Sequence, residues 1–224
     1  MVANPDRRAA VCDAALHILG SEGPRSLTHR AVDREAGLPL GTTSNYFPTR
    51  SALFAGMTRR LFEALAPDPA RLEQLATLPA HDAGPEYIAY IVERLLAQPN
   101  LGRAWFELRL EAHRSPEIAA LVTPVLQEGF AQDVAFHQAR GLPGDAETVR
   151  TLHHLVDGIL FDALTSTSRP DADPVELARR ASQALLSPWV KGLTDPCAAP
   201  ANSIATSTPA LVDWADAAPD HPHP

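Results

Sequence analysis

Apolar residues recur at intervals of three and four along most of the chain, and this spacing predicts the buried faces of α-helices. No alternation of apolar and polar residues typical of a β-strand competes with it. We therefore predict an all-α fold. Five segments after residue 86 carry the pattern: Ile88, Ile91, Val92 and Leu95; Leu101, Ala104, Trp105 and Leu108; Ile118, Leu121, Val122 and Val125; Leu152, Leu155, Val156, Ile159 and Leu160; and Val175, Ala178, Ala181 and Leu185.

Capping residues mark the helix boundaries in the first forty residues. Asn4 and Pro5 begin a first helix, which we predict to end at Gly20. Thr28 is placed to cap the free amides of a second helix, and Gly37 suits the left-handed conformation that follows a helix end. The N-terminal part is thus expected to start with two helices joined by a turn.

A short polar segment, residues 41–47, follows the second helix after only three residues. Such a connection forces two helices to cross steeply, and a capped support helix with a small, polar second helix is the pattern of a helix-turn-helix. We predict this motif over residues 28–47, with Pro39 in the first turn of its second helix. The groups offered to base edges or phosphates are those of Thr42, Thr43, Ser44 and Asn45.

The rest of the chain is divided by its prolines. A fourth helix is predicted after Pro48 and Thr49, and residues 67–85, with four prolines, are expected to form a loosely structured connection. Two helices are predicted at 145–167 and 173–191, while residues 195–224 hold six prolines and no cation and indicate a disordered tail. We expect a DNA-binding domain over 5–65, a helical domain over 66–193 and a tail over 194–224.

Charge separates the two parts of the chain. Residues 1–60 contain eight arginines and five acidic residues, a net charge of +3, whereas the remainder carries −11. A basic module on an acidic body is typical of a protein whose docking face alone meets phosphates. Two widely spaced cysteines, Cys12 and Cys197, favour a reducing cytoplasm, and no apolar stretch reaches the roughly 20 residues that span a membrane.

The predicted helix-turn-helix resembles the tetracycline-repressor family. The resemblance rests on the order of leucine–threonine at 27–28, alanine–glycine at 36–37, glycine–threonine at 41–42, tyrosine–phenylalanine at 46–47 and arginine-x-alanine-leucine at 50–53, within residues 6–62. It implies that Tyr46 and Arg50 contact phosphates, that residues 42, 43 and 45 face the groove, and that Thr28 lies near the DNA backbone. Pro39 and Leu40 depart from a serine and a lysine found in many members.

The resemblance also implies a helical second domain that dimerises and holds a small ligand. A mostly apolar pocket with a few polar groups would be lined by Trp105, Arg109, Phe130, His154, Asp157 and Phe161. The alternative is that the aromatic residues are core and that Arg109 and the acidic residues are solvated or paired. His153 and Asp157 have a spacing that suits metal ligands, but no further ligand lies nearby, so we expect no metal, and no motif supports catalysis or a cofactor.

We expect a homodimer that binds an inverted-repeat operator on double-stranded DNA and responds to a small molecule. The interface is assigned to the last two helices because small residues such as Ala163, Ala178, Ala181 and Ser182 would let helices approach closely. Two alternatives stay open. One is a helical carrier or enzyme with a degenerate DNA-binding part, and the other is an activator or a regulator without a ligand.

Overall fold

Helices make up the described chain, residues 4–167 and 169–193 of the computed structural model, and no strand occurs in these ranges. The predicted tail and Cys197 lie outside them. The ten helices are α1 (Pro5–Glu22), α2 (His29–Glu35), α3 (Thr42–Tyr46), α4 (Arg50–Ala64), α5 (Pro69–Ala76), α6 (Ala80–Leu96), α7 (Pro99–Arg114), α8 (Pro116–Ala139), α9 (Ala146–Leu164) and α10 (Pro174–Leu193). The all-α prediction is confirmed.

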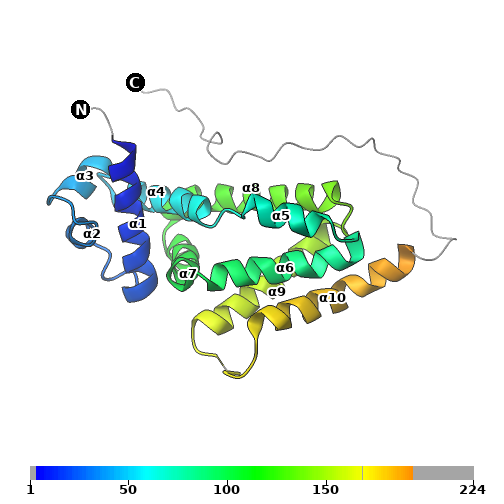
Figure 1. Ribbon diagram of the computed structural model, residues 1–224. Helices are drawn as coiled ribbons and strands as arrows, with labels where there is room; N and C mark the ends of the chain where they lie inside the picture. The colour runs from blue at the N-terminus through cyan, green and yellow to red at the C-terminus, as the bar shows by residue number, and fades with distance from the viewer. Residues whose placement is uncertain (1–3, 168, 194–224) are drawn as a thin grey trace.

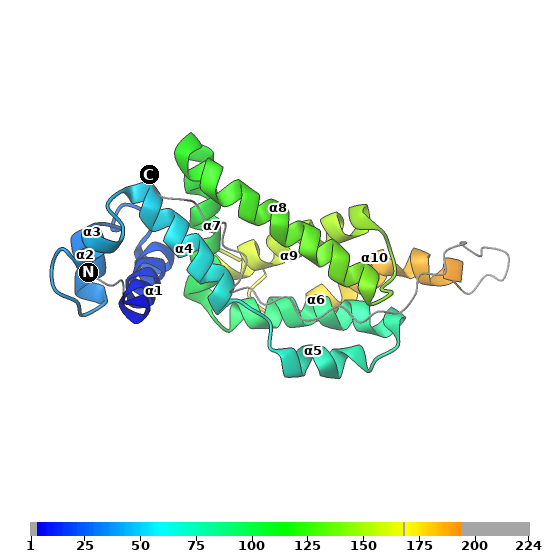
Figure 2. The ribbon, with the colours of Figure 1, turned by 90° about the horizontal axis from the view of Figure 1, so that it is seen from above.

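Helices α1–α3, which we call the head, lie at one end of the molecule, and α5–α10, the body, extend away from them (Figure 1). Helix α4 leads from the head toward the body (Figure 2), and α8 runs above α9 and α10 in the view of Figure 1. A single cluster of buried side chains joins the two parts. It includes Leu16 and Leu19 of α1, Phe54 of α4, Leu108 of α7 and Val122 of α8. The head is therefore packed directly on the body.

The first helix continues past its predicted end. Gly20 lies inside α1, and Gly23, with a φ of 82°, ends the helix by donating its amide to the carbonyl of Leu19. Gly20 is required for a different reason: a Cβ there would collide with the backbone carbonyl of Asn100 in α7. Arg103 of α7 donates to the carbonyl of Gly20 at 3.1 Å and holds the two helices together.

The expectation of a loose connection over 67–85 was wrong. Asp68 accepts a hydrogen bond from the amide of Ala70 and caps α5, with Pro69 as the first helical residue. Proline cannot donate a hydrogen bond, and the first turn of a helix needs no such donor. Helix α6 then starts at Ala80 and includes Pro85. Prolines that suggested a loop are thus mostly at or before helix starts.

The small residues of α10 pack inside the chain. Ala178 and Ser182 are fully buried, and Ala178 belongs to a cluster with Val92 of α6 and Leu160 of α9. The Ser182 hydroxyl donates to the carbonyl of Ala178 at 2.7 Å. Because both residues are buried within one chain, their assignment to an interface between subunits was wrong.

We predict that Gly20→Ala lowers the free energy of unfolding by about 2 kcal/mol, because a new methyl group in a packed contact forces the backbones of α1 and α7 apart. Gly129→Ala in α8 is the matched control. Its Cβ would meet the nearest atom, on Phe62, at an ordinary 3.9 Å, so it should stabilise the helix by about 0.5–1 kcal/mol. Urea unfolding followed by circular dichroism measures both, and equal effects would contradict the close contact.

Candidate nucleic-acid interface

Helices α2 and α3 form a helix-turn-helix whose start is set by one cap. The Thr28 hydroxyl oxygen accepts a hydrogen bond from the amide of Ala31 at 3.2 Å, as expected of a residue that precedes a helix. The chain leaves α2 through Gly37, with a φ of 64°, and the amide of Leu38 donates to the carbonyl of Asp33 at 2.9 Å. The turn therefore begins tied to α2.

Asp33 holds the other end of the turn. Its carboxylate accepts hydrogen bonds from the amide of Gly41 at 2.7 Å, from the amide of Thr43 at 2.7 Å and from the Thr43 hydroxyl at 2.6 Å. The side chain is buried, with 1% of its surface exposed. Burial raises the pKa of Asp33, but these hydrogen bonds and the nearby His29 together keep its pKa below the usual 3.8. One ionised carboxylate thus fixes α3 against α2.

This arrangement corrects two predictions. Thr43 is fully buried and gives both its amide and its hydroxyl to Asp33, so it positions the recognition helix and does not face the groove. Pro39 lies before α3, not in its first turn, since α3 starts at Thr42. The Pro39 carbonyl accepts hydrogen bonds from the amide of Thr42 at 3.1 Å and from its hydroxyl at 2.6 Å.

The outer face of the motif carries the other predicted residues. Asn45 and Ser44 are exposed, and the Ser44 hydroxyl is hydrogen-bonded to Nδ1 of His29 at 3.1 Å. Tyr46 is half-buried, and its hydroxyl oxygen accepts a hydrogen bond from the amide of Asn4 at 3.3 Å. Small hydroxyl, amide and phenol groups are thus gathered over α3 and the start of α1.

Arg50 extends this face at the first turn of α4. Its guanidinium stacks over the ring of Phe54 with 4.8 Å to the centroid and donates to the carbonyl of Leu27 at 3.4 Å. It also pairs with Glu111 of α7 at 3.1 Å. The Arg50 side chain keeps 47% of its surface exposed, whereas that of Glu111 keeps 14%. A cation beside the recognition helix is therefore engaged by an acid from the body.

Known proteins share this architecture. A family model described as "Tetracyclin repressor-like, C-terminal domain" matches residues 79–188. A structure of the multidrug binding protein EbrR with malachite green is 30% identical, with a TM-score of 0.55, and the alignment covers 81% of this chain and 99% of that one. The chain belongs to the tetracycline-repressor (TetR) family.

Other TetR-family comparisons agree. A family member from Streptomyces coelicolor A3 is 29% identical with a TM-score of 0.59, covering 81% of this chain and 99% of that one. The HTH-type transcriptional regulator BetI of Rhizobium meliloti is 27% identical over 119 residues, which are 53% of this chain and 58% of that protein. BetI of Agrobacterium fabrum is 30% identical over 53% of this chain and 57% of its own length. The matches span little more than half of these two regulators.

The ligand-binding residues predicted for this TetR-family body fall into separate contacts. Trp105 and Arg109 of α7 lie together, with the guanidinium 5.4 Å from the indole ring, and Arg109 pairs with Asp157 of α9 at 2.6 Å. Phe130 of α8 instead packs against His153, with 5.3 Å between ring centroids. The neighbouring His154 is exposed on α9. Trp105, Arg109 and Asp157 are thus brought together, and His154 is not.

Phe161 follows Asp157 by one turn of α9 and has a different partner. It packs edge-on against Phe106, with 5.5 Å between centroids, and keeps 53% of its surface exposed. The prediction that Phe161 lines an enclosed pocket is therefore not supported by its exposure. Among the described residues there is no cluster of three or more metal-ligating side chains and no helix long and apolar enough to cross a membrane.

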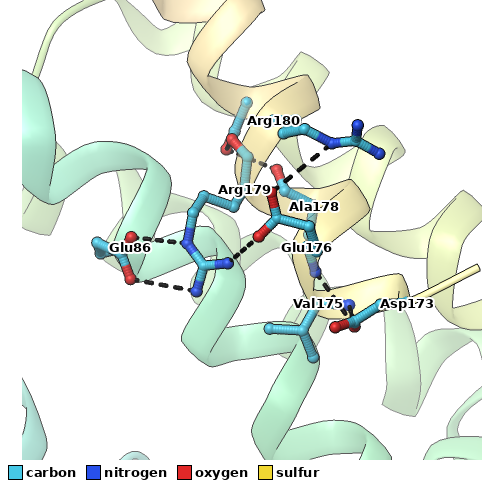
Figure 3. Close-up of polar contacts among 8 residues, drawn as sticks. Glu86, Asp173, Val175, Glu176, Ala178, Arg179 and Arg180 are labelled. Carbon is cyan, nitrogen blue, oxygen red and sulfur yellow. Dashed lines mark hydrogen bonds and ion pairs between the residues drawn. The ribbon is translucent and has the colours of Figure 1, made fainter.

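A polar groove of about 550 Å³ between α5, α6 and α10 was not predicted from the sequence. Arg179 of α10 lies on it and donates to Glu86 of α6 at 2.7 Å and to Glu176 at 2.5 Å (Figure 3). Helix α5 forms one side of the groove, and this proline-rich segment had been predicted to be a loose connection. The Arg179–Glu86 pair links α10 to α6, whereas the Arg179–Glu176 pair lies within α10.

Asp33 and Glu111 both contact the motif but were not among the residues predicted from the sequence. The hydrogen-bond partners of Asp33 lie eight and ten residues later in the sequence, so no local pattern indicates its buried role.

We predict that Asp33→Asn lowers the free energy of unfolding by about 3 kcal/mol, because an amide cannot replace a carboxylate that accepts three buried hydrogen bonds. DNA binding should fall with it, since α3 loses its anchor. Glu35→Gln removes an exposed charge from the same helix and should change stability by less than about 1 kcal/mol. Denaturant unfolding of both variants tests this, and similar losses would refute a special role for Asp33.

The same variant has a pH signature. Because the folded pKa of Asp33 lies below its unfolded value of 3.8, the carboxylate contributes stability above that pH and loses the contribution as pH falls through the folded pKa. The stability difference between wild type and Asp33→Asn should therefore be constant near neutrality and shrink below about pH 4. Unfolding curves between pH 3 and 7 measure it.

Proposed function

We propose that the protein is a homodimeric transcriptional repressor that binds an inverted-repeat operator and is released by a small molecule. The observation that carries this proposal is the position of α7. Within three residues, this helix presents Arg109 to Asp157 in the body and Glu111 to Arg50 at the edge of the helix-turn-helix. One rigid element thus contacts both the candidate ligand residues and the candidate DNA contacts.

The DNA contacts we propose are Thr28, Thr42, Ser44, Asn45, Tyr46 and Arg50. Ser44 and Asn45 are exposed on the recognition helix and have hydrogen-bonding groups suited to base edges. Tyr46 and Arg50 flank them and are suited to phosphates. The net charge of +3 over residues 1–60, against −11 for the rest, supports docking through this end. A protein that acts on DNA in this way would work in the cytoplasm.

The ligand would act through α7. EbrR has been crystallised with imidazole, ethidium, malachite green and proflavin. By analogy, a small molecule in this body would meet Trp105, Arg109 and Asp157. A ligand that separates Arg109 from Asp157 would displace α7, and with it Glu111 and the first turn of α4. Differential binding to two positions of α7 is what a released repressor needs.

The dimer would form through exposed apolar residues of α9 and α10. Phe161, Leu177 and Trp189 keep 53%, 38% and 45% of their surface exposed. Large apolar side chains in adjacent helices are typical of a subunit interface, and a second copy would cover them. This assigns the interface to the same two helices as the sequence analysis, but to different residues.

We predict that purified protein selects an inverted repeat from random DNA, with one half-site per subunit. Phe161→Arg should yield monomers in light scattering and weaken operator binding about 100-fold, since the second head no longer acts at high local concentration. Leu121→Arg places the same charge on an exposed position of α8 and should leave the dimer intact. Failure to select any sequence would favour a carrier with a degenerate head.

Glu111→Gln should raise operator affinity about three- to tenfold, because Arg50 then faces phosphate without a competing carboxylate. Glu107→Gln, one turn earlier on α7, removes the same charge without touching Arg50 and serves as the control. Fluorescence anisotropy with labelled operator measures both. An equal gain in the two variants would mean that only net charge matters and that the Arg50–Glu111 pair does not oppose binding.

A further inference from the structure

Leu40 is exposed at the place where DNA would dock. It keeps 70% of its surface in solvent, and among the described residues of α1–α4 and their connections it is the one large apolar side chain that is exposed. Single exposed leucines are ordinary on protein surfaces. This one, however, lies two residues before the recognition helix, at the end that helix-turn-helix proteins direct toward base edges.

The backbone around Leu40 is held on both sides. Before it, the Pro39 carbonyl accepts the amide and the hydroxyl of Thr42 at 3.1 and 2.6 Å. After it, the amide of Gly41 donates to the Asp33 carboxylate at 2.7 Å. The turn cannot swing to bury Leu40 against the head without breaking these bonds. The side chain is thus presented outward on a fixed support.

The chemistry of the side chain selects its partner. Leucine offers no hydrogen bond or charge to a phosphate, whereas the major groove displays one prominent apolar group, the C5 methyl of thymine. The exposed polar residues Ser44 and Asn45 follow in α3. Leu40 therefore adds an apolar side chain next to the residues that we propose to contact base edges. We propose that Leu40 contacts a thymine methyl in each half-site and makes this protein prefer thymine there.

This inference rests on the proposed DNA-binding function, and the test keeps the two apart. The operator is first selected from random DNA. Each thymine is then replaced by deoxyuridine, which removes only the methyl group and keeps the base pair. At the contacted position, affinity should fall about three- to fourfold per half-site and about tenfold when both half-sites are changed. Affinity is measured by fluorescence anisotropy at fixed salt.

Two variants identify the side chain responsible. Leu40→Ala should bind the thymine operator about as weakly as wild type binds the deoxyuridine operator, and it should show no further loss on the latter. Leu40→Lys should also lose the methyl effect, while its salt dependence steepens because a new cation meets phosphate. Leu78→Ala, an exposed leucine in the body, should behave as wild type. Thermal unfolding confirms that the variants are folded.

The outcomes are distinct. If no sequence is selected, the proposed function is wrong, and Leu40 has no base to read. If an operator is found but no deoxyuridine substitution weakens binding, or if Leu40→Ala keeps the full methyl effect, DNA binding stands and the assignment of Leu40 is overturned. A loss confined to one position per half-site, and absent in Leu40→Ala, supports it.

Discussion

The packing of α1 against α7 is the contact on which the other parts depend. Gly20 lets the backbones meet, and the same buried cluster continues through Phe54 of α4 to Leu108 and Val122 of the body. Closely packed interiors transmit displacement because they have few voids in which to absorb it. In the proposed function, a shift of α7 would therefore displace the helices that carry α2 and α3.

Charge supplies a second link between the two parts. Arg50 lies at the edge of the proposed DNA-facing surface and is paired with Glu111, and Ser51 donates a hydrogen bond to Glu117 at the start of α8. The carboxylates of Glu111 and Glu117, where α7 meets α8, thus both bind the first turn of α4. In the proposed function, these carboxylates would compete with phosphate for the first turn of α4.

Local signals predicted the helix-turn-helix well. Thr28 and Thr49 each cap a helix through an amide three residues ahead, so the interaction lies within a few residues of sequence and is visible there. The proline-rich segment was wrongly predicted to be a loose connection because proline is common both in loops and in the first turn of a helix. Thr43 was wrongly predicted to face the groove because its hydroxyl donates to Asp33, ten residues away, and a buried polar group serves the fold rather than a ligand.

The sequence by itself determined the all-α fold, the position of the DNA-binding motif and the basic head on an acidic body, since helical periodicity, caps and charge are local or additive properties. Only the tertiary structure decided which polar residues face outward, that Ala178 and Ser182 are buried within one chain, and that Arg50 meets Glu111, 61 residues away. Such pairings depend on how helices distant in sequence pack together, and no local pattern records that packing.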